Sequence, residues 1–429
     1  MASRQERLLR LAERTIARGV KNRSGQIRIE DEQLEGPFIT VDGNRLVDFG
    51  SCAYLGLNRH PDLLTAAADA LGRFGTAHSS SPMYTAIGLY DQLEQKLEQI
   101  LGAPVVVPPT TTLGHLAALP VVVDPDDLML IDQFAHASLR LASDVLRGRG
   151  TTVDVLGHND VAALRDRLER DAGSYRRVWF ATDGVFSMFG DVAPVEDIQP
   201  LLDEYPNLHV YYDDAHGFGW HGDNGRGYVL SKTDWHPRMI VAAGLSKSFG
   251  ATGGLLAFGD PALRQRVLYT GGPFTFSGPL QPADLGAAVA SANLHLSPTY
   301  ADLQQDFHRR IRFAGKLLHE YGLPVASTER TPIWFIVIGR LERALEITRA
   351  LMDEGYYVNP ASYPAVPMGL AGIRFTQTLH QTDEHLEGLI AALLRHISAS
   401  GALRVDIDLT AASQETAVES NRSTRIPQP

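Results

Sequence analysis

The 429-residue chain is long enough for more than one domain with a full core. Its 44% hydrophobic and 21% charged residues are typical of a globular protein, and a net charge of −11 argues against a general binder of nucleic acid or membrane surfaces. The single cysteine excludes intrachain disulfides and disfavours a metal site.

The N-terminal part is predicted to be an arm and a hairpin over residues 1–50. Apolar residues recur on one side of a charged helix expected over 3–19, and this stretch has no apolar core of a secretion signal. Asp42-Gly43 is a turn signal between two β-prone runs, which predicts a hairpin over 39–48. No run in the chain approaches the roughly 18 apolar residues that a membrane span needs. We therefore expect a cytoplasmic location.

From residue 104 a pattern of strand, loop and helix repeats. It predicts an α/β fold with a mostly parallel seven-stranded sheet and helices on both faces, within a large domain over 51–295. A smaller α+β domain is expected over 296–400, and the Ser-, Thr- and Ala-rich tail over 401–429 is expected to be disordered. The candidate strands of the sheet are 104–108, 128–132, 152–156, 178–182, 209–213, 239–243 and 254–258.

One lysine lies between an apolar strand and a run of small residues, in Ala243-Gly-Leu-Ser-Lys-Ser-Phe-Gly-Ala-Thr-Gly-Gly254. Glycines allow the backbone to approach a bulky ligand closely. Lys247 is expected to lose hydration there, which would make its amine a nucleophile suited to a Schiff base with a carbonyl cofactor. From this segment alone, an ordinary surface lysine is an equally good interpretation.

An acid at the end of a predicted strand, in Tyr211-Tyr-Asp-Asp-Ala-His-Gly-Phe-Gly219, favours the Schiff-base role of Lys247 over a surface lysine. Asp213 should lie at the carboxyl edge of the sheet, where open α/β sheets bind ligands. A carboxylate there can keep a pyridine nitrogen protonated, which lets pyridoxal phosphate accept electrons. The lysine and the acid together indicate that cofactor more strongly than either does alone.

Three segments carry a resemblance to a known family: Thr182-Asp-Gly-Val-Phe-Ser-Met-Phe-Gly-Asp191, Asp213-Asp-Ala-His-Gly217 and Ser246-Lys-Ser-Phe-Gly250. The chain resembles the fold-type-I pyridoxal-phosphate enzymes over roughly residues 45–395. It is most similar to the α-oxoamine synthases, which implies an aspartate-aminotransferase-like fold, pyridoxal 5′-phosphate as cofactor and a homodimer with shared active sites.

The resemblance implies roles for residues around the cofactor ring. Lys247 would hold the cofactor and remove a proton, Asp213 would pair with the pyridine nitrogen, and His136 would stack on the ring. Ser187 and His216 would lie near the phenolic oxygen. A structural polar role for His136 and a turn-stabilising role for Ser187 remain the alternatives.

Other residues are expected at the cofactor phosphate. Thr111 and Thr112 lie at a strand-to-helix turn, where backbone N–H groups and the positive helix end favour an anion, although a threonine there can also be a plain N-cap. Ser246 is a candidate because the residue three before the lysine is a glycine, where relatives often carry a hydroxyl. Thr275 and Ser277 resemble residues that reach the neighbouring subunit's phosphate site.

Three further residues are candidates at the substrate. Arg374 matches an arginine that grips the α-carboxylate, with a surface ion pair as the alternative. Cys52 is a candidate near the substrate, although a buried small hydrophobe is the other interpretation. His78 lies in a loop where the family usually has a glycine-rich run near the acyl donor, and no lysine or arginine occurs between Phe74 and Gln95.

Three functions are compared. The first is a transferase that joins an amino-acid-derived carbanion to an acyl thioester. The second is a pyridoxal-phosphate enzyme of specialised metabolism that applies the same carbanion chemistry to an unusual substrate, such as one similar to S-adenosylmethionine, by elimination or addition without acyl-CoA. The third is a non-catalytic binding or regulatory protein, which the intact Lys247, Asp213, His216 and Arg374 disfavour. The altered loop at 75–84 predicts that the electrophile is not a common short acyl-CoA.

Overall fold

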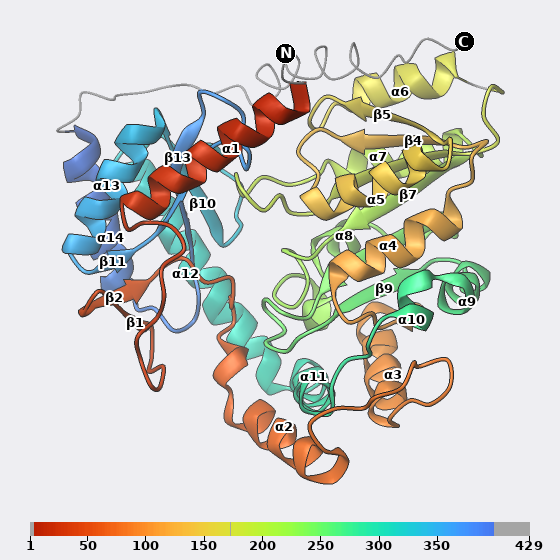
Figure 1. Cartoon of the computed structure of the whole chain (residues 1–429), viewed down its shortest axis with the longest axis horizontal. Helices are drawn as coiled ribbons and strands as arrows, with labels where there is room; N and C mark the ends of the chain where they lie inside the picture. The colour runs from red at the N-terminus through yellow and green to blue at the C-terminus, as the bar shows by residue number, and fades with distance from the viewer. Residues whose placement is uncertain (1–3, 172, 399–429) are drawn as a thin grey trace. The chain divides into compact units, whose positions relative to one another are not determined.

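All seven strands predicted for the large sheet are present, and they lie in the order β3-β9-β8-β7-β6-β4-β5. The structure is a computed structural model that describes residues 4–171 and 173–398. Strands β4 to β8 run parallel to one another, whereas β9 is antiparallel to both β8 and β3. The predicted α/β class with a mostly parallel sheet is confirmed (Figure 1). The strands are β3 (Val105–Val106), β4 (Leu128–Asp132), β5 (Thr152–Leu156), β6 (Val178–Asp183), β7 (Leu208–Asp213), β8 (Met239–Gly244) and β9 (Gly254–Phe258).

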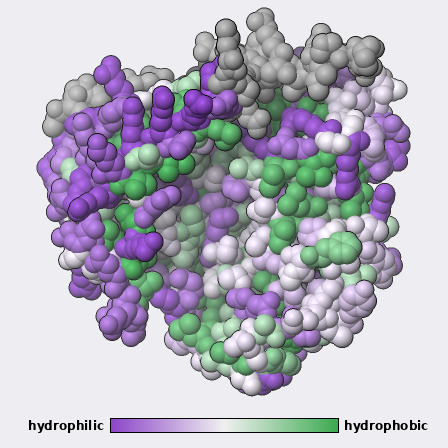
Figure 2. All heavy atoms as spheres, in the orientation of Figure 1, coloured by the Kyte–Doolittle hydropathy of each residue, from purple (hydrophilic) through white to green (hydrophobic). Residues whose placement is uncertain are grey.

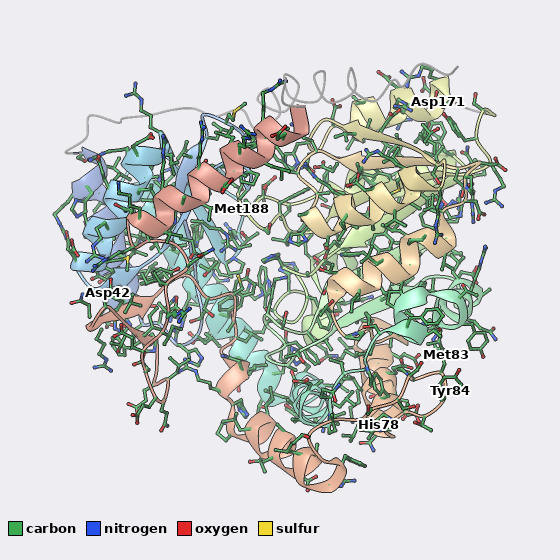
Figure 3. The ribbon with its side chains drawn as sticks, in the orientation of Figure 1. Asp42, His78, Met83, Tyr84, Asp171 and Met188 are labelled. Atoms are coloured by element: carbon green, nitrogen blue, oxygen red, sulfur yellow. The ribbon has the colours of Figure 1, made fainter. Side chains whose placement is uncertain are left out.

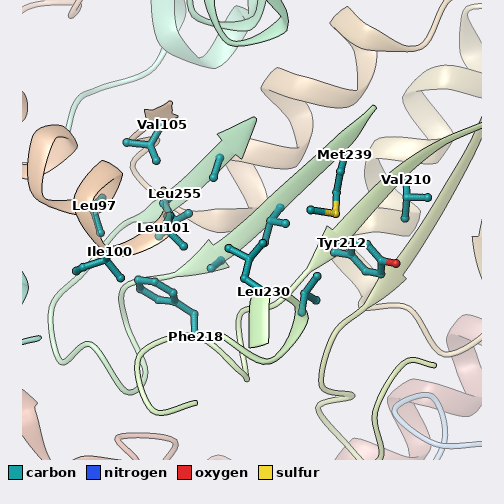
Figure 4. Packing of buried hydrophobic residues seen from close by; sticks show 14 of the residues in the cluster. Leu97, Ile100, Leu101, Val105, Val210, Tyr212, Phe218, Leu230, Met239 and Leu255 are labelled. Atoms are coloured by element: carbon teal, nitrogen blue, oxygen red, sulfur yellow. The ribbon is translucent and has the colours of Figure 1, made fainter. Parts of the chain in front are cut away.

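Helices cover both faces of this sheet, which explains why its strands are apolar along their whole length. Side chains alternate between the faces, so that Val210 and Tyr212 pack into one hydrophobic cluster and Tyr211 packs into another. Figure 4 shows the first cluster, where Met239 of β8 and Leu97 of a helix join them. The helices of this unit are α2 (Pro61–Phe74), α3 (Leu89–Leu101), α4 (Thr111–Val122), α5 (Ala137–Gly148), α6 (Val161–Arg170), α7 (Val195–Glu204), α8 (Tyr228–Lys232), α9 (Pro261–Thr270), α10 (Gly272–Phe276) and α11 (Pro282–His295), with short 3₁₀ turns at Leu57–Arg59 and Asp223–Gly225.

The described chain divides into two units. The large unit holds residues 55–171, 173–186 and 192–305, and the small unit holds 4–54, 187–191 and 306–398. Helix α12 (Thr299–Glu320) begins in the first and ends in the second. The N-terminal residues therefore group with the C-terminal segment, although the sequence predicted a separate part over 1–50. The predicted tail over 401–429 lies outside the described residues.

The small unit contains two three-stranded sheets, ordered β1-β2-β11 and β10-β13-β12. The predicted hairpin is present, and both of its turn residues, Asp42 and Gly43, have positive φ as such a turn requires. Parallel pairing of β2 with β11 attaches the hairpin to the C-terminal part of the unit. No helix among the described residues is long and apolar enough to span a membrane. The elements are α1 (Arg4–Lys21), β1 (Phe38–Val41), β2 (Asn44–Asp48), β10 (Ile333–Gly339), α13 (Leu341–Asp353), β11 (Tyr356–Tyr357), β12 (Asn359–Ala361), β13 (Ala371–Thr376) and α14 (Asp383–Ser398).

Candidate active site

The carboxyl ends of β6, β7 and β8 bring the candidate residues of the large unit to one edge of the sheet. Asp183 of β6 lies directly opposite Asp213 of β7 in the strand register. Lys247 follows the end of β8 by three residues and is half-buried. Its charge acts on Asp213, Asp183 and His136. This edge therefore combines a cationic amine, two carboxyl groups and an imidazole.

Asp213 is buried and held by both of its carboxylate oxygens. Its Oδ2 lies 2.9 Å from Nε2 of His115, and its Oδ1 accepts the backbone N–H of Ala215 at 3.1 Å. Burial alone would raise its pKa, but the charge and hydrogen bond of His115, together with Lys247 and His136, lower the pKa of Asp213 to about 2. Asp213 is therefore an anion able to pair with a protonated ring nitrogen.

Asp183 has the opposite charge preference and helps to fix His136. Burial, followed by the nearby charge of Asp213, raises the pKa of Asp183 well above its ordinary value. Its Oδ1 accepts the backbone N–H of His136 at 3.0 Å. The His136 side chain caps α5 by accepting the backbone N–H of Ser138, and desolvation lowers the pKa of His136. The ring is thus neutral near pH 7, and part of the residue is exposed to solvent.

The space beside Gly244 is bordered by both the lysine and the start of α4. A Cβ atom added at Gly244 would lie 3.8 Å from Lys247 Nζ and 3.3 Å from Thr111 Oγ1. The Thr111 hydroxyl donates to the carbonyl of Ala243 at 3.1 Å. A glycine at this position therefore keeps the space between the lysine and the helix start open.

The first turn of α4 can receive an anion. Thr110 caps this helix by accepting the backbone N–H of Leu113 at 3.1 Å, and the first turn contains no acidic residue. The backbone N–H groups of Thr111 and Thr112 have no hydrogen-bond partner within the described chain. Ser246, the residue just before the lysine, is exposed to solvent. A lysine amine, two free N–H donors and an ionised strand-end acid fit the aldehyde, phosphate and pyridine nitrogen of pyridoxal phosphate.

Two further buried residues, Asp214 and His216, follow Asp213 closely in the chain. Asp214 is buried against Gly184, Gly217 and Gly227, where an added Cβ would come within 2.4 Å of its carboxylate oxygens. Burial raises its pKa to about 8 despite the backbone N–H of Val229 at 3.0 Å. Its contacts are those of a structural acid. His216 is buried in the turn after β7.

The small unit holds a second cluster, around Arg374. This arginine is 7% exposed in β13, and its Nε donates to the carbonyl oxygen of Ser187 at 2.7 Å. Its Nη2 lies 3.6 Å from the thiol of Cys52. Arg374 forms no ion pair with any carboxylate of the described residues. A buried guanidinium with N–H groups to spare is suited to binding an anion from outside the chain.

The remaining candidates lie in the large unit, on a loop and on α10. His78 Nε2 lies 3.0 Å from the carbonyl oxygen of Thr85, and Figure 3 shows His78 on the same loop as the exposed Met83 and Tyr84. Ser81 Oγ donates to the carbonyl of Phe274 at 3.4 Å, so this loop reaches α10. Thr275 and Ser277 on and after α10 are half-buried.

His115, Tyr211 and Asp183 lie near this edge but were not predicted as site residues. Asp183 could have been predicted from the sequence, because it is the last residue of β6 just as Asp213 is the last residue of β7. Tyr211 lies two residues before Asp213 and therefore on the same face of β7. His115 is separated from both in sequence, and only the packing of α4 on this face brings it to them.

Comparisons with known proteins agree with this geometry. The family model for aminotransferase class I and II matches residues 44–393. An 8-amino-7-oxononanoate synthase of Thermoanaerobacter pseudethanolicus is 32% identical over 366 residues, which cover 84% of this chain and 90% of that protein. A serine palmitoyltransferase of Bacteriovorax stolpii is 32% identical over 362 residues, which cover 84% of each chain.

Solved structures agree in fold. The serine palmitoyltransferase of Sphingomonas wittichii superposes with a TM-score of 0.84 at 22% identity, covering 94% of this chain and all of that one. An 8-amino-7-oxononanoate synthase of Francisella tularensis superposes with a TM-score of 0.71 at 19% identity, covering 83% of this chain.

Proposed function

The chain belongs to the α-oxoamine synthase family within aminotransferase class I and II, and we propose that it joins an amino acid to an acyl thioester. It is a pyridoxal-phosphate-dependent enzyme that forms a carbon–carbon bond. Loss of the amino acid's carboxylate would leave an amino ketone. The observation that carries this proposal is the grouping of Lys247, Asp213 and the free N–H groups of α4 at one sheet edge.

Lys247 has two roles in the proposal. Bound pyridoxal phosphate supplies an aldehyde that condenses with amines and a ring that accepts the electron pair of a breaking bond. The Lys247 amine would hold the aldehyde, and once free it would be the base that takes the α-proton. The anionic Asp213 would accept the ring N–H, while the N–H groups of Thr111 and Thr112 would bind the phosphate. His136, His216 and Ser246 complete the proposed cofactor contacts of the large unit.

Arg374 is proposed to bind the substrate α-carboxylate. It is buried, has donors to spare and has no carboxylate partner among the described residues. Binding the carboxylate there would orient the amino acid before its α-proton is removed. Cys52 lies beside the guanidinium and is a candidate wall of the same pocket.

One observation favours the second candidate function, in which another electrophile replaces acyl-CoA. Residues 75–94 contain no lysine or arginine, and the His78 ring is engaged with Thr85. This loop therefore offers little to the phosphates of coenzyme A. We accordingly propose that a common short acyl-CoA is not the natural donor.

A homodimer with shared sites is proposed from the exposed apolar surface of the large unit. Phe276 is 89% exposed and Tyr84 is 82% exposed, although both are large apolar side chains. A hollow of about 500 Å³ is lined by apolar residues of α4 and α5 and by parts of α9 and α10, with the charged Asp124, Arg149 and Arg266 also in its lining. Figure 2 shows hydrophobic residues gathered over α4 and α5 on the same side. A second copy covering this surface would let Thr275 and Ser277 approach its phosphate site.

The proposed function is tested by following two signals in the same reaction. The purified holoenzyme should exchange the α-proton of its amino acid with D₂O, and an acyl thioester series should show saturable release of the free thiol. Exchange without thiol release from any thioester would favour the second candidate function. Absence of both signals, together with absence of a covalently bound cofactor, would favour the non-catalytic protein. A cytoplasmic location remains a prediction from the composition.

A further inference from the structure

A buried chain of three side chains lies behind the sheet edge of the large unit. The Tyr211 hydroxyl is 2.8 Å from His115 Nδ1, and His115 Nε2 is 2.9 Å from Asp213 Oδ2. Tyr211 and His115 are fully buried, and Asp213 is 4% exposed. The imidazole thus uses both of its nitrogens within the protein, and the chain ends on the carboxylate proposed to face the cofactor ring.

The fold explains why one histidine reaches both partners. Tyr211 and Asp213 are two residues apart on β7, so their side chains leave the same face of the sheet. Helix α4 packs on this face, and His115 lies one helical turn after Thr111. The helix that presents free N–H groups at its start therefore also carries the residue that bonds Asp213.

The protons of this chain are constrained by the ionised carboxylate. Asp213 only accepts, so His115 Nε2 carries the proton of their hydrogen bond. His115 Nδ1 then accepts from the Tyr211 hydroxyl when the ring is neutral, or donates to its oxygen when the ring is charged. Burial and the charge of Asp213 raise the pKa of Tyr211 well above its ordinary value, so the phenol keeps its proton.

We propose that His115 is a positioning residue for the cofactor, which together with Tyr211 holds Asp213 ionised and oriented toward the pyridine nitrogen. The inference rests on the proposed function, because it requires a pyridine ring at Asp213. The backbone N–H of Ala215 fixes one carboxylate oxygen and His115 fixes the other. The other charged or titratable groups that interact with this carboxylate are Asp183, Asp214, His136 and Lys247.

Replacing His115 separates this role from simple packing. In His115→Phe the ring volume is kept, but Asp213 loses its N–H donor. In His115→Gln the amide can donate to Asp213 and accept from Tyr211, although it cannot become charged. Tyr211→Phe removes only the hydroxyl, so His115 loses the partner that orients it. His295→Gln is the matched control, since His295 is equally buried in this unit but bonds Ser291 and Gly219.

The experiment is ¹⁵N NMR of the holoenzyme loaded with pyridoxal phosphate labelled at the ring nitrogen, recorded across a pH series. The wild-type and His295→Gln proteins should show a protonated ring nitrogen throughout the neutral range. In His115→Phe the signal should move toward the unprotonated position. Exchange of the substrate α-proton should fall by roughly 10- to 100-fold, the equivalent of one hydrogen bond to a charged group. His115→Gln should restore most of the protonated signal, and Tyr211→Phe should lower the pH at which the proton is lost.

An unchanged nitrogen signal in His115→Phe, with cofactor still attached to Lys247, would overturn this inference and leave the proposed function standing. Absence of attached cofactor in the wild-type protein would instead refute the proposed function. If circular dichroism shows that His115→Phe does not fold, the Tyr211→Phe variant provides the test instead. In that case a ring-nitrogen titration identical to wild type would overturn the inference.

Discussion

Replacing Arg374 should selectively weaken binding of substrates that carry a carboxylate. A guanidinium has five N–H groups. In the described structure the Nε hydrogen is taken by the carbonyl of Ser187, Nη2 lies 3.6 Å from the Cys52 sulfur, and the Tyr54 hydroxyl is a further hydrogen-bond partner of the guanidinium. At least two N–H groups therefore remain for a planar anion, with no competing carboxylate among the described residues.

The magnitude follows from those two donors. Hydrogen bonds to charged groups contribute about 1.5–3 kcal/mol each, so a bidentate contact contributes about 3–6 kcal/mol. Since 1.4 kcal/mol is tenfold in a binding constant, Arg374→Ala should weaken amino-acid binding by roughly 10²- to 10⁴-fold. Arg374→Lys should recover only part of this loss, because an ammonium cannot form the two-pronged contact.

The assay is a titration of the holoenzyme's visible absorbance with an amino acid and with the matching amine that lacks the carboxylate. Arg374→Ala should lose affinity for the amino acid and change little for the amine. Arg309→Ala, which removes an exposed ion pair with Asp383 in the same unit, is the control and should change neither. Equal loss for both ligands, or no loss for the amino acid, would refute a carboxylate-binding role.

The other predictions concern the lysine, the buried acid, the apolar surface and the altered loop. Lys247→Ala should leave no lysine peptide modified by the cofactor after borohydride reduction, and mass spectrometry finding one elsewhere would contradict the assignment. The pKa of Asp214 is raised to about 8, so the stability linked to its protonated form is fully present below about pH 4 and is lost as the pH rises through 8. Asp214→Asn should therefore flatten the fall in melting temperature between pH 5 and 9, and an unaltered slope would show that another group causes it. Phe276→Glu should shift the mass measured by light scattering from dimer to monomer, whereas a dimer of unchanged concentration dependence would place the interface elsewhere. Acetyl- and malonyl-CoA should give no saturable thiol release, because the His78 loop has no lysine or arginine; saturable release from either would show that this loop does not exclude them.

The sheet could be predicted from sequence because its strands are buried on both faces. Continuous apolar runs such as 239–243 and 254–258 give a strong signal without any knowledge of their neighbours. The reactive edge was partly predictable for a related reason, since Asp213 and Lys247 directly follow two of these runs. Strand order depends on contacts between distant segments, such as β3 with β9, which the local pattern does not contain.

The features that were not predicted from the sequence all depend on packing between distant parts of the chain. Pairing of β2 with β11 joins the N-terminal hairpin to a segment some 300 residues later. The sequence of neither strand indicates which strand it pairs with. The bond from His115 to Asp213 spans 98 residues and requires α4 to pack on one face of β7. The bond from Arg374 to Ser187 similarly groups residues 187–191 with the small unit.

The most direct test of the central claim is mass spectrometry of the products. The holoenzyme would be incubated with each amino acid, with and without a series of acyl thioesters, using substrate labelled with ¹³C in the carboxyl group. The proposed function predicts a thioester-dependent product that contains the acyl group and the amino-acid nitrogen, has lost the label as carbon dioxide, and is absent with Lys247→Ala. A product that forms equally without any thioester, or one formed by loss of a side-chain group, would contradict the claim.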